Sequence, residues 1–79
     1  MARTFSSARH QALRKYIAEK RKKSGLRQVD LAKLLRRNQS YVTNLERGQK
    51  AVEVVELIEW AEAIGFDAAD VVKRIAKVR

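Results

Sequence analysis

Apolar residues recur at helical spacing in two short neighbouring segments of the chain, at about residues 28–35 and 39–47. At about 100° per residue, the apolar positions of each segment fall on one side of a helix. These positions are Leu31, Ala32 and Leu35 in the first segment and Val42 and Leu45 in the second, with Tyr41 at their edge. Only residues 36–38 separate the segments, which leaves room for no more than a tight turn. The pattern predicts a helix-turn-helix.

The outward arc of the second predicted helix is polar and holds no carboxylate. Its members are Gln39, Ser40, Thr43, Asn44 and Arg47. Amides and hydroxyls are side chains that hydrogen-bond to base edges in the major groove of DNA. Asn38 stands one residue before this helix, where its side-chain oxygen can cap the free backbone amides. The arc is therefore a candidate surface for reading DNA.

The same period predicts three further helices. The first begins at Ser6 or Ser7 as N-cap and runs to about Lys23. The second stops at Gly65, and the third begins after Asp67 as N-cap. Their apolar stripes are, in order, Leu13, Tyr16 and Ile17; Val54, Leu57, Ile58, Ala61 and Ile64; and Ala68, Val71, Val72, Ile75 and Val78.

Four acids recur at every third position along the fourth helix of the chain, namely Glu53, Glu56, Glu59 and Glu62. Such a series precesses around a helix and does not converge, so we expect a solvated face and no metal site. Trp60 flanks Leu57 and Ile64 on the same helix. We expect it to anchor the core or an interface rather than to stack on a ligand.

Charge is divided unevenly along the chain, which has a net charge of +9 over 79 residues. Residues 1–50 carry 14 lysines and arginines against three acids, whereas residues 51–79 carry four against six. A basic half joined to a mildly acidic half suits a protein with one polyanion-binding face. The plainer explanation, that the cations only keep a small domain in solution, stays open on charge alone.

Several classes of function are disfavoured by residues that the chain lacks. It has no cysteine, and its only histidine is His10, which we expect to be exposed. There is no glycine-rich phosphate loop and no pairing of acids with a base, so we expect no catalytic residue, no metal and no cofactor. The first ten residues hold no apolar signal region, and no apolar run is long enough to span a membrane. We expect a cytoplasmic protein.

The runs GLRQVDLAKLL and QSYVTNLERG resemble the XRE family of helix-turn-helix regulators, to which the lambda repressor and Cro also belong. With the downstream run VEVVELIEWAEAIGFD, the resemblance covers roughly residues 10–68. It implies an all-α, five-helix, lambda-repressor-like domain over residues 1–79, with the helix-turn-helix at helices 2 and 3, about residues 28–47. It also implies a dimer that binds specific sequences of double-stranded DNA.

Helix geometry and the resemblance together assign roles to individual residues. The DNA-reading residues are expected to be Gln39, Ser40, Thr43 and Asn44, of which Gln39 is the strongest candidate because it starts the recognition helix. Phosphate contacts are expected from Arg27, Gln28, Arg37, Asn38, Arg47 and Lys50. The family's counterpart of Arg21 pairs with the glutamate of the ERG motif, here Glu46, so a partly buried ion pair is expected between them.

The C-terminal helix, at about residues 67–78, is expected to contribute to a dimer interface. Its stripe is apolar, and a small domain has limited core left to cover it. The interface residues would be Val71, Val72, Ile75 and Val78. The alternative is that this stripe packs on helices 1 and 4 of its own chain.

The resemblance makes a repressor acting on a pseudo-palindromic operator, in a bacterial or phage cytoplasm, the leading hypothesis. An antitoxin, which would also bind a toxin, and a restriction-modification controller are the alternatives. The chain has almost nothing outside the domain, which argues mildly against the antitoxin.

The chain departs from the family pattern at three positions, where cations replace structural residues. Arg36 stands where the turn usually has a glycine, Arg37 where many members have an apolar residue, and Arg27 where a threonine or serine commonly caps helix 2. Either Arg36 adopts a left-handed backbone or helix 2 runs on for one residue.

Overall fold

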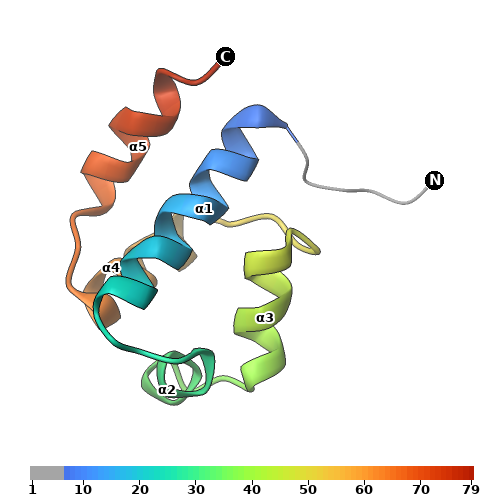
Figure 1. Ribbon diagram of the computed structural model, residues 1–79, viewed down its shortest axis with the longest axis vertical. Coiled ribbons are helices and arrows are strands. Elements are labelled where there is room, and N and C mark those ends of the chain that lie inside the picture. Colours follow the sequence, from blue (N-terminus) through green and yellow to red (C-terminus); the bar gives the residue numbers. More distant parts are fainter. Residues whose placement is uncertain (1–6) are drawn as a thin grey trace.

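The computed structural model describes residues 7–79, and within them the chain forms five helices and no strand (Figure 1). The helices are α1 (Ala8–Lys23), α2 (Gln28–Leu34), α3 (Gln39–Arg47), α4 (Val54–Ile64) and α5 (Ala68–Ala76). In Figure 1, α5 runs alongside α1, while α3 stands on the other side of α1 with α2 at its lower end. The all-α architecture that the sequence predicts is confirmed.

Two of the predicted N-cap side chains bond to the first turn of their helices. The Ser7 hydroxyl accepts from the His10 backbone N–H at 3.1 Å, and the Asp67 carboxylate accepts from Ala69 at 3.0 Å, as predicted. Ser6, the other candidate cap of α1, lies outside the described residues. The prediction for Asn38 is wrong in part: it occupies the N-cap position of α3, but its side chain makes no capping bond.

Arg36 adopts the left-handed backbone, with a φ of 57°, and α2 does not run on. The Arg36 N–H donates to the Lys33 carbonyl at 3.1 Å, and the Arg37 N–H donates to the Ala32 carbonyl at 2.8 Å. These two bonds satisfy carbonyls in the last turn of α2. At most helix ends of this type, the residue with the left-handed backbone is a glycine. With a Cβ at this position the conformation costs about 1 to 2 kcal/mol.

The core lies where the inner faces of all five helices meet. Six large side chains are fully buried, namely Ile17, Leu31, Val42, Leu45, Trp60 and Val71. Trp60 is therefore a core anchor. Two residues of the predicted α4 stripe lie outside the core, because Val54, in the first turn, is 73% exposed and Ile58 is 45% exposed.

The C-terminal helix α5 packs on α1 of its own chain, which corrects part of the interface prediction. Val71 is fully buried in the core, and Ile75 is half-buried against it, so Val71 is not free to contact a second chain. Val72 points outward and is 49% exposed, and Val78 is half-buried. The alternative of packing within the chain therefore holds for the inner edge of this stripe.

His10 is half-buried rather than exposed, which corrects a second expectation. Its Nε2 accepts a hydrogen bond at 3.1 Å from the backbone N–H of Val52. The bond ties the start of α1 to the loop between α3 and α4. The histidine thus has a structural contact within the chain.

Candidate nucleic-acid interface

The polar arc of α3 faces outward because the opposite face of the helix is locked into the core. Val42 and Leu45 are fully buried on that face. Of the arc, Gln39, Ser40 and Arg47 are exposed, and Thr43 and Asn44 are half-buried. The five side chains follow one another along the full length of the helix, from its first turn to its last. A groove of DNA laid along α3 would meet them in succession.

The structure brings Arg21 of α1 and Glu46 of α3 together. The guanidinium donates twice to the carboxylate, from Nε to Oε2 at 2.7 Å and from Nη2 to Oε1 at 3.0 Å. Both side chains are less than a tenth exposed. Nη1 of Arg21 also donates to the Leu26 carbonyl at 2.8 Å, which ties in the loop before α2. This bidentate pair sets the orientation of α3 against α1.

Two predicted DNA contacts, Gln28 and Thr43, are hydrogen-bonded to each other. The Thr43 hydroxyl donates to Oε1 of Gln28 at 2.7 Å, and Nε2 of Gln28 donates to Glu46 at 3.0 Å. A carboxylate only accepts, so the amide must turn its nitrogen to Glu46 and its oxygen to Thr43. The network Arg21, Glu46, Gln28 and Thr43 thus joins α1, α2 and α3.

Glu56 is the one acid of the α4 series that is buried, which corrects the expectation of a wholly solvated face. Its carboxylate accepts from Lys50 Nζ at 2.6 and 2.7 Å, from the Tyr41 hydroxyl at 2.9 Å and from the Glu53 N–H at 2.9 Å. Burial by itself raises the pKa of Glu56, but these bonds, led by the Lys50 ammonium, outweigh it and hold the pKa below the ordinary 4.5.

Lys50, predicted to contact phosphate, is instead committed to this internal pair. The Tyr41 ring completes the cluster at the edge of the core. Trp60 Nε1 donates to its hydroxyl at 3.3 Å, and burial raises the pKa of Tyr41 to about 12. A second network therefore joins α3, the following loop and α4.

The remaining predicted phosphate contacts lie on the surface beside α3. Arg37, Asn38 and Arg47 are exposed, and the Arg37 guanidinium stacks on the outer face of Tyr41, 4.5 Å from the ring centre. Arg27 is exposed too, but it donates to the Asp30 carboxylate at 2.9 and 3.0 Å. These bonds, with one from the Arg27 backbone N–H, lower the pKa of Asp30 to about 2.

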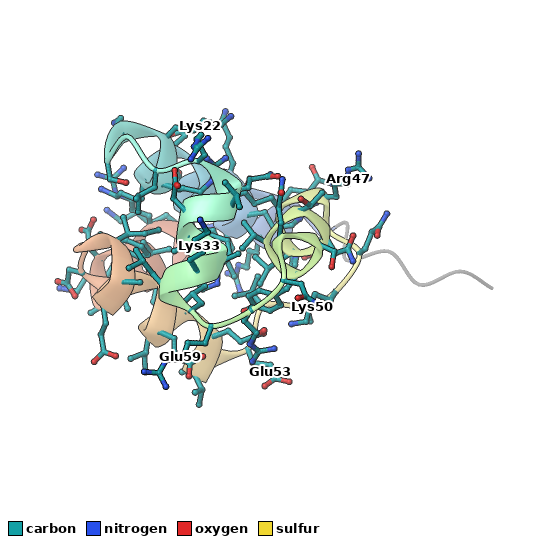
Figure 2. All side chains as sticks on the ribbon, turned by 90° about the horizontal axis from the view of Figure 1, so that it is seen from below. Lys22, Lys33, Arg47, Lys50, Glu53 and Glu59 are labelled. Atoms are coloured by element: carbon teal, nitrogen blue, oxygen red, sulfur yellow. The ribbon has the colours of Figure 1, made fainter. Side chains whose placement is uncertain are left out.

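The two halves of the chain differ in charge on the surface of the molecule as well. Figure 2 shows Lys22 and Arg47 in the upper part of the view and Glu53 and Glu59, both near α4, at the bottom, with Lys50 close to Glu53. The exposed cations Arg37 and Arg47 lie at the two ends of α3, so a polyanion that reaches the polar arc meets positive charge. This arrangement favours one binding orientation.

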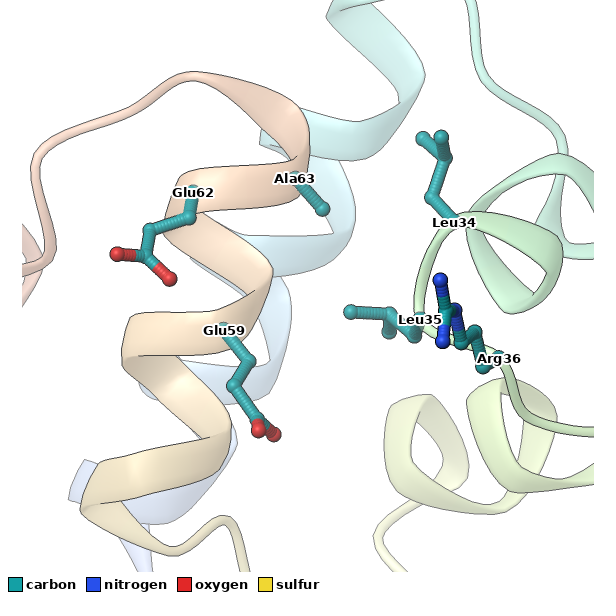
Figure 3. Close-up of a pocket in the computed structure, with 6 residues that line it drawn as sticks. All are labelled: Leu34, Leu35, Arg36, Glu59, Glu62 and Ala63. Carbon is teal, nitrogen blue, oxygen red and sulfur yellow. The ribbon is translucent and has the colours of Figure 1, made fainter.

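The α4 acids form no ligand set. A shallow depression between the end of α2 and α4 is lined by Leu34, Leu35, Arg36, Glu59, Glu62 and Ala63 (Figure 3). The carboxylates of Glu59 and Glu62 point in different directions. Over residues 7–79, no three histidines or acids gather as a metal site would need, and no helix is long and apolar enough to cross a membrane.

Sequence reasoning missed the roles of Glu56, His10 and Arg14. For Glu56 a signal was present, because it lies one turn before Trp60 and therefore on the same inward face. Arg14 Nη1 donates to the Glu46 carbonyl at 3.4 Å, and its guanidinium lies where a Cβ of residue 48 would be. Gly48 has a φ of 83°, which favours glycine, and a larger residue there would also make the Arg14 side chain shift.

Comparison with known proteins gives a consistent answer. A family model described as helix-turn-helix matches residues 17–71. The chain is 32% identical to an XRE-family like protein from Pseudomonas syringae pv. tomato str. DC3000, over 87% of this chain and 84% of that one, with a TM-score of 0.82. Among curated proteins, no sequence match was found.

Two further solved structures are similar. The clp gene regulator ClgR from Corynebacterium glutamicum has a TM-score of 0.78 and 30% identity, over 90% of this chain and 92% of that one. The restriction-modification controller protein C.AhdI from Aeromonas hydrophila has a TM-score of 0.68 and 32% identity, over 75% of this chain and 86% of that one.

Proposed function

The chain belongs to the XRE family of helix-turn-helix proteins, and from that premise we propose that it represses transcription by binding a pseudo-palindromic operator as a homodimer. DNA-binding transcriptional regulation is the function that the family and the regulator and controller structures support. The observation that carries the proposal is the outward arc of α3, polar along its whole length and fixed by buried neighbours on its other side.

Base reading falls to the exposed residues Gln39 and Ser40 and to the half-buried Asn44. Gln39 and Ser40 stand in the first turn of α3, the end that enters the groove in helix-turn-helix complexes, and Asn44 follows one turn later. An amide pairs bidentately with adenine, while a hydroxyl suits several bases. Gln39 is the principal reader on these grounds.

Phosphate contacts position the arc without specifying sequence. Arg47 and Asn38 stand at the two ends of α3, and Arg37 is held beside its start by stacking on Tyr41. The amide oxygen of Gln28 accepts from Thr43 and one of its N–H groups donates to Glu46, so its second N–H can donate to a phosphate. Lys50 drops out of this set because Glu56 holds it.

Dimerisation accounts for apolar side chains that one chain leaves uncovered. Val54, Val55 and Ile58 on α4 and Val72 on α5 are between 45% and 73% exposed. A domain of 79 residues is marginal alone, so burying such residues against a second copy also adds stability. Two-fold symmetry would place two recognition helices about 10 bp apart on the DNA. Binding there would occlude RNA polymerase.

Selection of bound sites from a random duplex pool tests the proposal. A pseudo-palindromic consensus with half-sites about 10 bp apart is the expected result. A single half-site would contradict the dimer, and the absence of any consensus would indicate a nonspecific DNA binder. Reporter expression with the selected operator placed over a promoter then distinguishes repression from activation.

Control of restriction-modification genes is a second candidate, favoured by the likeness to C.AhdI over most of that chain. It shares the DNA-binding mode and differs only in the genes controlled. If the selected consensus occurs upstream of an adjacent methylase or endonuclease gene, this candidate is supported. An operator elsewhere rejects it.

A further inference from the structure

Thr43 stands on the reading face of α3, yet its polar group is turned inward. It lies three and four residues after Ser40 and Gln39, so it shares their face of the helix. Its hydroxyl donates its only proton to Gln28 Oε1 at 2.7 Å, on the side of α3 that faces α2. The side chain is half-buried. A base edge presented to α3 therefore cannot receive that proton.

The acceptor of this bond is itself held in place. Gln28 Nε2 is bonded to Glu46 at 3.0 Å, and the carboxylate is bonded twice to Arg21. Reversing the Gln28 amide would point its oxygen at a carboxylate oxygen, so the arrangement admits one orientation. In helices threonine divides between two χ1 rotamers, and the Gln28 bond selects one of them. Gln28 is thus a positioning residue for Thr43.

With its proton donated to Gln28, the hydroxyl can only accept, and the γ-methyl is the other group that Thr43 can offer to DNA. We propose that Thr43 reads a thymine in each half-site by contact between this methyl and the thymine C5 methyl, and not by a hydrogen bond. The inference rests on the proposed function. Among the four bases only thymine carries a methyl in the major groove. A purine there would set its N7 acceptor against a methyl and lose a water partner.

Deoxyuridine, which is thymidine without the methyl, provides the test. On the selected operator, each thymine is replaced in turn by deoxyuridine, and the Kd of the wild-type protein is measured. We expect one position per half-site at which the replacement weakens binding by about fourfold, the effect of removing one buried methyl. Other thymines should tolerate it.

Two variants divide the side chain into its parts. Thr43→Val keeps a methyl and removes the hydroxyl, so it should retain the preference for thymine over deoxyuridine at that position. Thr43→Ser keeps the hydroxyl and removes the methyl, and it should bind both operators equally. Arg47→Ala serves as the matched control on the same helix, since it should weaken binding to both operators by the same factor. Circular dichroism melts establish that each variant is folded.

Three results would overturn the inference. These are a wild-type protein indifferent to deoxyuridine at every position, a Thr43→Val variant that loses the thymine preference, and a Thr43→Ser variant that keeps it. In each case the palindromic consensus would survive, and the proposed function with it. If site selection yields no consensus, the proposed function itself fails, so the two failures are distinct.

Discussion

Two arginine–carboxylate ion pairs lie near the start of α2. Their N–O distances are similar, but their side chains differ greatly in exposure to solvent. Arg21 and Glu46 meet at 2.7 Å with side chains 8% and 9% exposed, whereas Arg27 and Asp30 meet at 2.9 Å with side chains 76% and 30% exposed. Water screens the second pair, while the first would leave a buried charge behind if either partner were removed. Pairs with similar N–O distances should therefore differ greatly in how much stability is lost when one partner is removed.

The difference extends to function. The buried pair joins α1 to α3 and, through Gln28, to α2, so it holds the helix whose outward arc faces DNA. The exposed pair closes only the first turn of α2, where Asp30 accepts from the Arg27 backbone N–H. Residues that hold α3 and residues that α3 presents are thus separate sets, apart from Thr43, which belongs to both.

The largest effect is expected from Glu46→Ala, which leaves Arg21 buried without its carboxylate. The loss should be about 3 to 5 kcal/mol. For a small domain whose total stability is about 5 to 15 kcal/mol, that is enough to lower the melting temperature steeply. Thermal unfolding followed by circular dichroism measures it. An unchanged melt would show that the buried pair does not hold the fold.

The next effect concerns binding rather than stability. Gln39→Ala should cost about 1 to 3 kcal/mol on the cognate operator and leave the melting temperature unchanged. Arg47→Ala should weaken binding to cognate and unrelated duplexes alike and reduce the salt dependence by about one phosphate contact. Titrations at several salt concentrations distinguish the two. Equal losses on all sequences for both variants would refute the division between readers and positioners.

A stabilising change is expected at Arg36, in the turn between α2 and α3. Arg36 has a φ of 57°, and glycine adopts that backbone without strain from a Cβ. Arg36→Gly should raise the stability by about 1 kcal/mol, slightly offset by the greater freedom of glycine in the unfolded chain. Chemical denaturation gives the value. A destabilised variant would mean that the arginine side chain itself supports the turn.

Acid should weaken the second buried network. Because the pKa of Glu56 is lower in the folded chain than its ordinary 4.5, its contribution is present above that value and is lost as the pH falls through the folded pKa. Glu56→Gln should remove part of the stability at neutral pH and flatten its decline in acid. Melts at a series of pH values below 5 test this. A variant that declines as steeply as the wild-type protein would assign the acid sensitivity to other carboxylates.

The smallest effect is expected from the exposed pair. Arg27→Ala should leave the melting temperature unchanged, because the pair is solvated and Asp30 keeps its bond to the backbone. It is the matched control for Glu46→Ala, since each variant removes one partner of an arginine–carboxylate pair. A large loss of stability here would break the comparison.

The sequence predicts three helix boundaries well because each of them has a local cause. Ser7, Asp67 and Gly65 end or begin helices through their own backbone or side-chain chemistry. The pair of Arg21 and Glu46 came only from the family resemblance. Periodicity also placed Val42 and Leu45 inward, which leaves the α3 arc facing outward.

Contacts between helices were beyond the sequence. The bond between Thr43 and Gln28 depends on how closely α3 approaches α2, and no spacing along the chain encodes that distance. The capping bond expected of Asn38 fails although the residue type is favourable. The apolar stripe of α5 predicts an interface role for Val71, but in the structure Val71 is buried where α5 packs on α1 of the same chain.

The central claim is that the buried network of Arg21, Glu46 and Gln28 holds α3 so that its outward arc can read bases. Parallel site selection with the wild-type protein and Gln39→Ala tests this claim most directly. Both proteins should return palindromes with the same half-site spacing. The consensus of the variant should be relaxed at one position per half-site, with every other position unchanged. Identical consensus sequences from the two proteins would contradict the account.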